Sequence, residues 1–153
     1  MHVLVLALLI GIVTGLRAFT GPAAVAWSAR SGPLILAGTR LSFLGSAWCV
    51  WIFTALAVFE LINDQLPKTP SRTVPAQFIP RVLLGGFCGA ALGLPFGSLW
   101  VGVVAGAIGA VIGTLGGASA RAKLSAAFGR DLPAALLEDL VAIVSAWLIV
   151  THL

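Results

Sequence analysis

The chain begins with the apolar stretch Val3-Leu-Val-Leu-Ala-Leu-Leu-Ile-Gly-Ile-Val-Thr-Gly-Leu16, and Arg17 follows inside the same hydrophobic segment. A run of this length and composition is typical of a transmembrane helix. An arginine inside such a helix costs at least ~2.5–3.5 kcal/mol on insertion scales, so a compensating interaction is expected. Gly21 and Pro22 follow closely and predict a helix break, because proline removes a backbone donor. The sequence therefore predicts an interrupted first helix that carries a buried cation.

Composition places the whole chain in the membrane class. Of its 153 residues, 59% are hydrophobic and 9% are charged, and the mean hydropathy is +1.09. Soluble domains carry about 25% charged residues. We expect one all-α transmembrane domain over residues 1–153, whose partner is the lipid bilayer. The first run lacks the basic start and the cleavage site of a signal peptide, so we expect it to be retained.

Five apolar segments predict about five transmembrane helices, at residues 3–29, 43–65, 78–94, 98–128 and about 133–152. The first is expected to be interrupted at Gly21-Pro22. The fourth changes after Gly117 from an apolar, glycine-rich sequence to an alanine-rich, basic one, and we expect an interruption there too.

Positive charge gathers on one side of these segments. That side receives Lys68, Arg72, Arg81, Arg121, Lys123 and Arg130, whereas the other receives only Arg30 and Arg40. The richer side should be cytoplasmic. This bias predicts a multi-pass inner (plasma) membrane protein with a cytoplasmic N-terminus and an external or periplasmic C-terminus. The same rule accounts for the net charge of +4, so we expect no nucleic-acid partner.

Glycines spaced by four residues form faces on three of the predicted helices: Gly11-Gly15, Gly85-Gly89-Gly93-Gly97, Gly102-Gly106 and Gly109-Gly113-Gly117. Faces without side chains let helix backbones approach closely in lipid. They can also line a narrow conduit. Because a small chain offers few internal helix neighbours, we expect a homo-oligomer.

The segment around Gly11 and Gly15 is similar to the one around Gly109 and Gly113, and each precedes a span that carries acids. In a five-span topology the two pairs of spans have opposite orientations. Matched interrupted helices in two inverted halves point to a transporter-type site. An inverted repeat with interrupted first and fourth helices is therefore our hypothesis.

Arg17 with Thr14, Thr20 and Gly21 forms the candidate solute-binding site, since a buried cation lies beside interrupted backbone. The alternative is an arginine that reaches the interface or fills a helix crossing.

Glu60, Asp64 and Glu138 are the candidate gate or proton relay. Glu60 and Asp64 share one helix face at i, i+4 spacing, and carboxylates within a span pair with arginine, bind a cation or carry protons. The alternative is pairing with Arg72, Arg81 or Arg121, which would fix loops to helices.

The proline-rich connection at residues 65–73 supplies candidate anion ligands: Lys68, Thr69, Ser71 and Arg72. Guanidinium, ammonium and hydroxyl donors suit an anion. The alternative is a rigid connector held against Glu60 and Asp64.

Catalytic and metal motifs are missing from the sequence. His2 and His152 lie at the two termini, and Cys49 and Cys88 lie in apolar runs, where cysteine packs as a small core residue. Phosphate-binding glycine loops and nucleophile elbows are also missing. We expect no enzyme activity, no metal and no cofactor.

Two motifs resemble a known family. Gly15-Leu-Arg-Ala-Phe-Thr-Gly-Pro-Ala23 and Glu60-Leu-Ile-Asn-Asp-Gln-Leu-Pro-Lys-Thr-Pro-Ser-Arg72, with glycine-rich third and fourth spans, are similar to the DUF4126 family of uncharacterised small membrane proteins. The resemblance covers most of the chain. It implies a membrane location and shared motif positions at Arg17, Glu60, Asp64 and Arg72, without naming a substrate.

These observations predict a transporter or channel for a small polar or anionic solute, with the acids available for proton coupling. The alternative is a membrane scaffold or assembly protein that docks partner helices through its glycine faces. A water-filled cavity at Arg17 would favour transport. A dry bundle with Arg17 fully paired would favour the scaffold.

Overall fold

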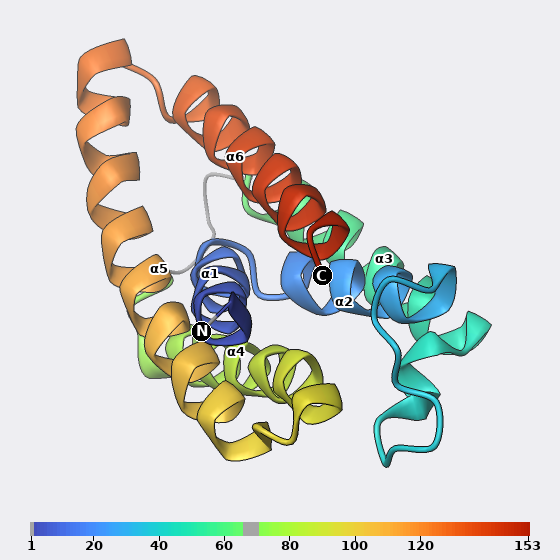
Figure 1. Cartoon of the computed structure of the whole chain (residues 1–153). Coiled ribbons are helices and arrows are strands. Elements are labelled where there is room, and N and C mark those ends of the chain that lie inside the picture. Colours follow the sequence, from blue (N-terminus) through green and yellow to red (C-terminus); the bar gives the residue numbers. More distant parts are fainter. Residues whose placement is uncertain (1, 66–70) are drawn as a thin grey trace.

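The computed structural model describes residues 2–65 and 71–153, and within these ranges it consists of helices and connecting loops, without strands. The helices are α1 (His2–Leu16), α2 (Thr20–Ser31), α3 (Ala47–Asn63), α4 (Pro75–Gly93), α5 (Leu99–Phe128) and α6 (Asp131–Thr151) (Figure 1). Two short 3-10 helices, η1 (Ser42–Gly45) and η2 (Leu94–Phe96), precede α3 and follow α4. The all-α prediction is confirmed.

Three helical segments are long and apolar enough to cross a membrane: Pro75–Phe96, Leu99–Phe128 and Asp131–Thr151. They support the assignment to the membrane class. Helices α1 and α3 are apolar but shorter, with 15 and 17 residues, so the five-span count is not confirmed. At 1.5 Å per residue, a helix needs about 20 residues to cross the hydrocarbon core without tilting.

The first predicted span is in fact two helices. The break lies at residues 17–19, before Gly21 and Pro22 rather than at them. Pro22 instead occupies the first turn of α2, where its missing N–H has no intrahelical partner to lose. The Gly-Pro pair therefore lies at the start of a new helix. The interruption separates two helices and is not a kink within one helix.

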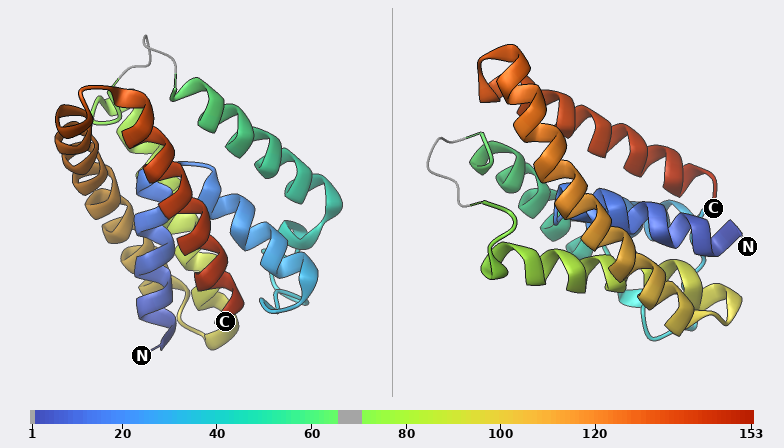
Figure 2. Two further views of the ribbon diagram at one scale, coloured as in Figure 1. Left: turned by 90° about the horizontal axis from the view of Figure 1, so that it is seen from above. Right: turned by 90° about the vertical axis from the view of Figure 1, so that its left-hand side faces the viewer.

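The chain reverses direction at this break. Arg17 contacts Asp139 near the start of α6, and the Ser28 hydroxyl donates to the Val150 carbonyl at 3.4 Å near the end of α6. Helix α2 therefore runs parallel to α6 and back along α1. As a result, the N-terminus and the C-terminus lie at the same end of the bundle (Figure 2). Our topology placed them on opposite sides because it counted residues 3–29 as one crossing.

Glycine faces hold α1, α4 and α5 together. A Cβ added at Gly11 would collide with the Gly106 carbonyl, and one added at Gly89 would collide with the Gly102 carbonyl. The predicted glycine-rich packing is thus confirmed, and these faces meet neighbouring helices of the same chain. Oligomerisation stays a prediction.

The similar glycine pairs of α1 and α5 pack directly against each other. A Cβ at Gly109 would meet the Leu8 carbonyl, and one at Gly113 would meet the Ile12 carbonyl. The contact positions increase along both helices, from Leu8 to Ile12 and from Gly109 to Gly113, so α1 and α5 run parallel. An inverted repeat requires the two helices to run in opposite directions. The repeat is not confirmed, and the sequence similarity has a simpler origin in the two matching faces of one interface.

The predicted interruption of the fourth span is wrong. Helix α5 continues through 30 residues, Leu99–Phe128. Glycine keeps its backbone N–H, and α5 contains no proline, so the hydrogen-bond ladder is not broken.

Replacing Gly89 with alanine should destabilise the bundle by about 1–3 kcal/mol, the usual cost of overpacking. The added methyl group would collide with the Gly102 backbone, so α4 and α5 must separate. Thermal melting of the purified protein in detergent measures the change. Gly116→Ala is the matched control, because a Cβ there meets nothing within 4 Å. Equal melting temperatures for the two variants would contradict this packing.

Candidate functional site

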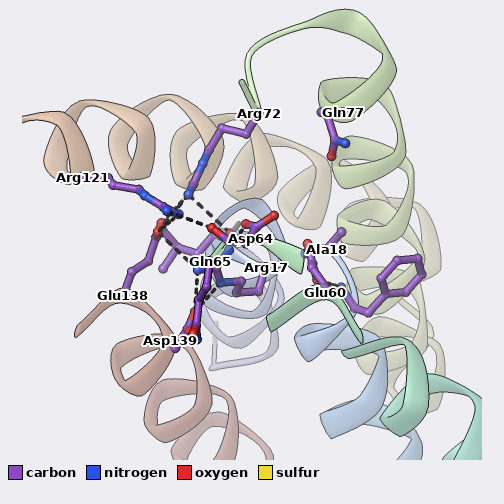
Figure 3. Close-up of polar contacts among 12 residues, drawn as sticks. Arg17, Ala18, Glu60, Asp64, Gln65, Arg72, Gln77, Arg121, Glu138 and Asp139 are labelled. Carbon is purple, nitrogen blue, oxygen red and sulfur yellow. Dashed lines mark hydrogen bonds and ion pairs between the residues drawn. The ribbon is translucent and has the colours of Figure 1, made fainter. Parts of the chain in front are cut away.

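Charged side chains meet where α1 ends, at the end of the bundle opposite the termini (Figure 3). The sequence holds five Asp and Glu residues in all, and each one pairs with an arginine. We name this set the charge network; its members are Arg17, Arg72, Arg81, Arg121, Glu60, Asp64, Asp131, Glu138 and Asp139. They come from the α1–α2 break, α3, the start of α4, α5 and α6. Residues far apart in sequence thus form one cluster.

Arg17 lies at the centre of the charge network with 0% of its surface exposed. Its Nη1 atom forms an ion pair with Asp64, which caps the end of α3. Its Nε donates to Asp139 Oδ1 at 2.6 Å, and its Nη2 lies 3.7 Å from Glu138 Oε2. Nη2 itself makes no well-directed hydrogen bond. Arg17 is therefore dry and neutralised by acids from two helices.

Glu60 accepts the backbone donors that the α1–α2 break leaves free. Its Oε1 receives the Ala18 N–H at 2.8 Å, and its Oε2 receives the Phe19 N–H at 2.9 Å. Arg81 Nη2 also donates to Oε1, at 3.3 Å. Unpaired N–H groups at the start of a helix attract carboxylates. Glu60 thus stabilises the reversal of the chain.

Glu138 joins α6 to the segment before α4. Arg72 grips both of its carboxylate oxygens, with Nη2 at 2.8 Å from Oε2, and Arg121 Nη1 lies 3.6 Å away. Arg72 also donates to the Leu16 carbonyl at 3.4 Å. Gly117 makes room for this pair, because a Cβ there would lie 3.0 Å from Glu138 Oε1. The contact ties four segments together.

Arg121 extends the charge network toward solvent. Its Nη2 donates to Asp131 Oδ2 at 2.6 Å and to the Asp64 carbonyl at 3.0 Å. Ser125 also donates to Asp131, at 2.7 Å. This outer pair is the exposed edge of the cluster and joins α5 to the start of α6.

The predicted solute ligands are buried around the break. The Thr14 hydroxyl donates to the Ile10 carbonyl at 2.8 Å, and Gly21 packs against the Thr14 side chain. Thr20 is buried, and its hydroxyl has no hydrogen-bond partner. These residues lie around Arg17 as predicted, but in this conformation they form no water-filled site, since Arg17 has no exposed surface.

The predicted anion cradle is not formed by the described part of the connection. Lys68 and Thr69 lie outside the described residues. Ser71 is exposed and shares a 2.8 Å hydrogen bond with Thr73, whereas Arg72 binds Glu138. The two side chains thus face different partners, and Arg72 anchors the connector to Glu138 rather than to Glu60 and Asp64, which the alternative named.

Sequence analysis missed Asp139 and Arg81 as site residues. Asp139 belongs to no sequence motif, and its role depends on its contact with Arg17, which lies 122 positions earlier. Gln77 accepts from Arg81 at 2.9 Å and orients it toward Glu60. One signal was available: each charge in an apolar segment of this sequence needs a partner, and Arg17 and Arg81 were the cations most deeply placed.

The described residues hold no group of three or more His, Cys, Asp or Glu that could bind a metal ion. Searches with models of protein families, among curated proteins and among solved structures find no match for this chain. The charge network combines guanidinium groups, which bind anions in many proteins, with the carboxylates that pair with them here.

Arg17→Ala should lower the stability of the folded protein by about 3–5 kcal/mol, because it leaves Asp64 and Asp139 buried without their cation. Arg17→Lys keeps the charge but loses the planar fork, so its loss should be smaller. Thermal melting in detergent gives both values. Arg30→Ala serves as the control, since Arg30 is exposed at the other end of the bundle. An unchanged melting temperature for Arg17→Ala would contradict the central role of Arg17.

Proposed function

We propose that this chain is a membrane transporter for a small anionic solute and that the charge network is its closed state. A dry, fully paired Arg17 taken alone favours the scaffold; the observation that carries the transporter proposal is the gathering of five carboxylates and four arginines at one end of an apolar bundle, where Asp64 and Asp139 share the Arg17 guanidinium. Two carboxylates from different helices occupy the positions at which an anion would bind. They act as internal competitors of the solute.

Proton coupling follows from this competition. A carboxylate that takes up a proton loses its attraction for Arg17, because only the charged form pairs strongly. Asp139 is held by Arg17 and by Gln65, whose Nε2 lies 3.4 Å from Oδ2. Protonation of Asp139 would release one side of the guanidinium and open it to an anion. Loss of the Asp139 charge should therefore favour solute binding.

Stability alone is a poor explanation for so many buried charges. A buried ion pair often contributes no more than well-packed apolar side chains of similar size. The glycine contacts already hold α1, α4 and α5 together without charge. Ionisable groups inside membrane helices usually mark solute or proton pathways, and this supports a transport role for the charge network.

A non-transporting scaffold is the second candidate, and one observation favours it: Arg17 is dry and paired. The docking mode expected for a scaffold fits less well, because glycine faces such as those at Gly11 and Gly89 are covered by the chain's own helices. A scaffold would have to bind partner helices through other surfaces.

We place the end of the bundle that carries the charge network on the cytoplasmic side of the inner (plasma) membrane. Arg72, Arg121, Lys123 and Arg130 lie toward this end, and positive residues favour the cytoplasm. Both termini then lie on the external side. This topology replaces our prediction of a cytoplasmic N-terminus. Membership of the DUF4126 family and a homo-oligomeric state remain predictions.

Proteoliposomes that contain the wild-type protein should take up small anions. Asp139→Asn removes the charge that competes for Arg17, so its uptake should be faster than that of the wild type. Arg17→Lys should lower uptake without unfolding the protein. A panel of radiolabelled monovalent and divalent anions provides the measurement.

Arg30→Lys is the matched control for Arg17→Lys and should transport like the wild type, since Arg30 lies outside the charge network. Uptake by none of the anions, from a protein that is folded and correctly inserted, would exclude the transporter and favour the scaffold. Uptake that Arg17→Lys leaves unchanged would remove Arg17 from the solute path.

Reporter fusions test the orientation. Fusions after Phe128 should report a cytoplasmic location, because this position follows α5 at the basic end of the bundle. Fusions at the N-terminus and at the C-terminus should both report the external side. Termini on opposite sides of the membrane would show that α1 and α2 form one crossing, in contradiction to the reversal at residues 17–19.

A further inference from the structure

The α1–α2 break presents a set of hydrogen-bond donors that fits a carboxylate. The Ala18 and Phe19 N–H groups each hold one Glu60 oxygen, at 2.8 and 2.9 Å, and Arg81 Nη2 adds a third donor at 3.3 Å. Helix α2 has 12 residues, so its N-terminus contributes a positive dipole end. Discontinuous helices in transporters direct such ends at the anionic groups of their substrates.

Two further donors at this place have no partner. The Arg81 side chain is 2% exposed, yet its Nε makes no hydrogen bond, and the Thr20 hydroxyl is also unpaired although Thr20 is only 7% exposed. Buried polar groups are nearly always paired, and an exception needs an explanation. Arg81 already binds the Glu60 carboxylate, and Thr20 is the first residue of α2. The site thus holds more donors than Glu60 uses.

We propose that the N-terminus of α2 and Arg81 form a binding site for the carboxylate group of a small monocarboxylate, and that Glu60 occupies this site as a tethered ligand. The proposal rests on the proposed function, since it names the class of anion that the transporter carries. An entering carboxylate exchanges with Glu60 and takes over the Ala18 and Phe19 N–H groups. The unused Arg81 Nε is then available to the second ligand oxygen.

The geometry favours a carboxylate over other anions. The two backbone donors each bind a separate oxygen of one planar group, which a halide cannot reproduce. A single guanidinium balances one negative charge, whereas a dianionic phosphate would bring a second charge into a buried place. Planar guanidinium forks also match the two oxygens of a carboxylate.

Chemical rescue tests the site without any transport assay. Glu60→Ala removes the tethered carboxylate and leaves its place empty, so the variant should melt earlier than the wild type. Sodium formate should raise its melting temperature by roughly 3 °C for each tenfold increase in concentration above the dissociation constant. Sodium chloride at equal ionic strength should not raise the melting temperature of Glu60→Ala. Formate should not raise the melting temperature of the wild type.

Two variants give the test its specificity. Asp131→Ala removes a carboxylate that binds Arg121 and Ser125 outside the Arg17 site, so formate should not restore it. Combining Glu60→Ala with Arg81→Gln should abolish the rescue. Equal rescue of Asp131→Ala and Glu60→Ala, or full rescue without Arg81, would overturn the proposed site, because formate would then bind guanidinium groups in general.

If Glu60→Ala does not fold, its yield of monodisperse protein is compared after expression and purification with formate and with chloride. A yield that only formate restores supports the site, and equal yields overturn it. Uptake of labelled formate by wild-type proteoliposomes is measured separately. Rescue without uptake of any anion would keep the site and exclude transport, whereas uptake of other anions without rescue would keep transport and exclude this site.

Discussion

The fold depends on the pairing of Arg17 inside an apolar bundle. A guanidinium with no exposed surface is tolerated only where carboxylates and backbone acceptors surround it. Asp64 at the end of α3 and Asp139 in the first turns of α6 supply these charges. Because Asp64 caps α3 and Asp139 lies inside α6, the pairing fixes where α3 stops and how α6 lies relative to α1.

Glycine packing and charge pairing stabilise different parts of the bundle. Close contacts such as Gly89 on Gly102 bring α4 and α5 together without polar groups and leave that part of the molecule dry. The acids and the arginines that pair with them gather at the opposite end, where α1 ends, and Gly117 extends the glycine contacts to them. One end of the bundle is thus held mainly by van der Waals contact and the other mainly by ion pairs.

The sequence was sufficient to predict an all-helical chain with apolar helices of membrane length, its glycine-mediated packing and the burial of Arg17, because composition and periodicity report burial directly. It could not reveal that the chain turns back at residues 17–19. A glycine followed by a proline is compatible with a kink, a helix start or a reversal, and the choice is made by Glu60, which binds the break from 41 and 42 positions away. The Arg17–Asp139 contact was hidden for the same reason, since no local pattern connects residues on α1 and α6. The glycine faces of α1 and α5 are similar in sequence because they pack against each other in parallel. We interpreted this similarity as an inverted repeat.

Glu60 shows how one contact can serve both structure and function. Its carboxylate satisfies two N–H groups that would otherwise be buried without partners, each of which would cost about 1–3 kcal/mol. The break could not exist without an anion at this position, so the chain provides its own. The same requirement means that a carboxylate able to make these hydrogen bonds could take the place of the side chain, with Arg81 as its cationic partner. If the proposed function holds, the contact that stabilises the break therefore also sets which solutes bind there.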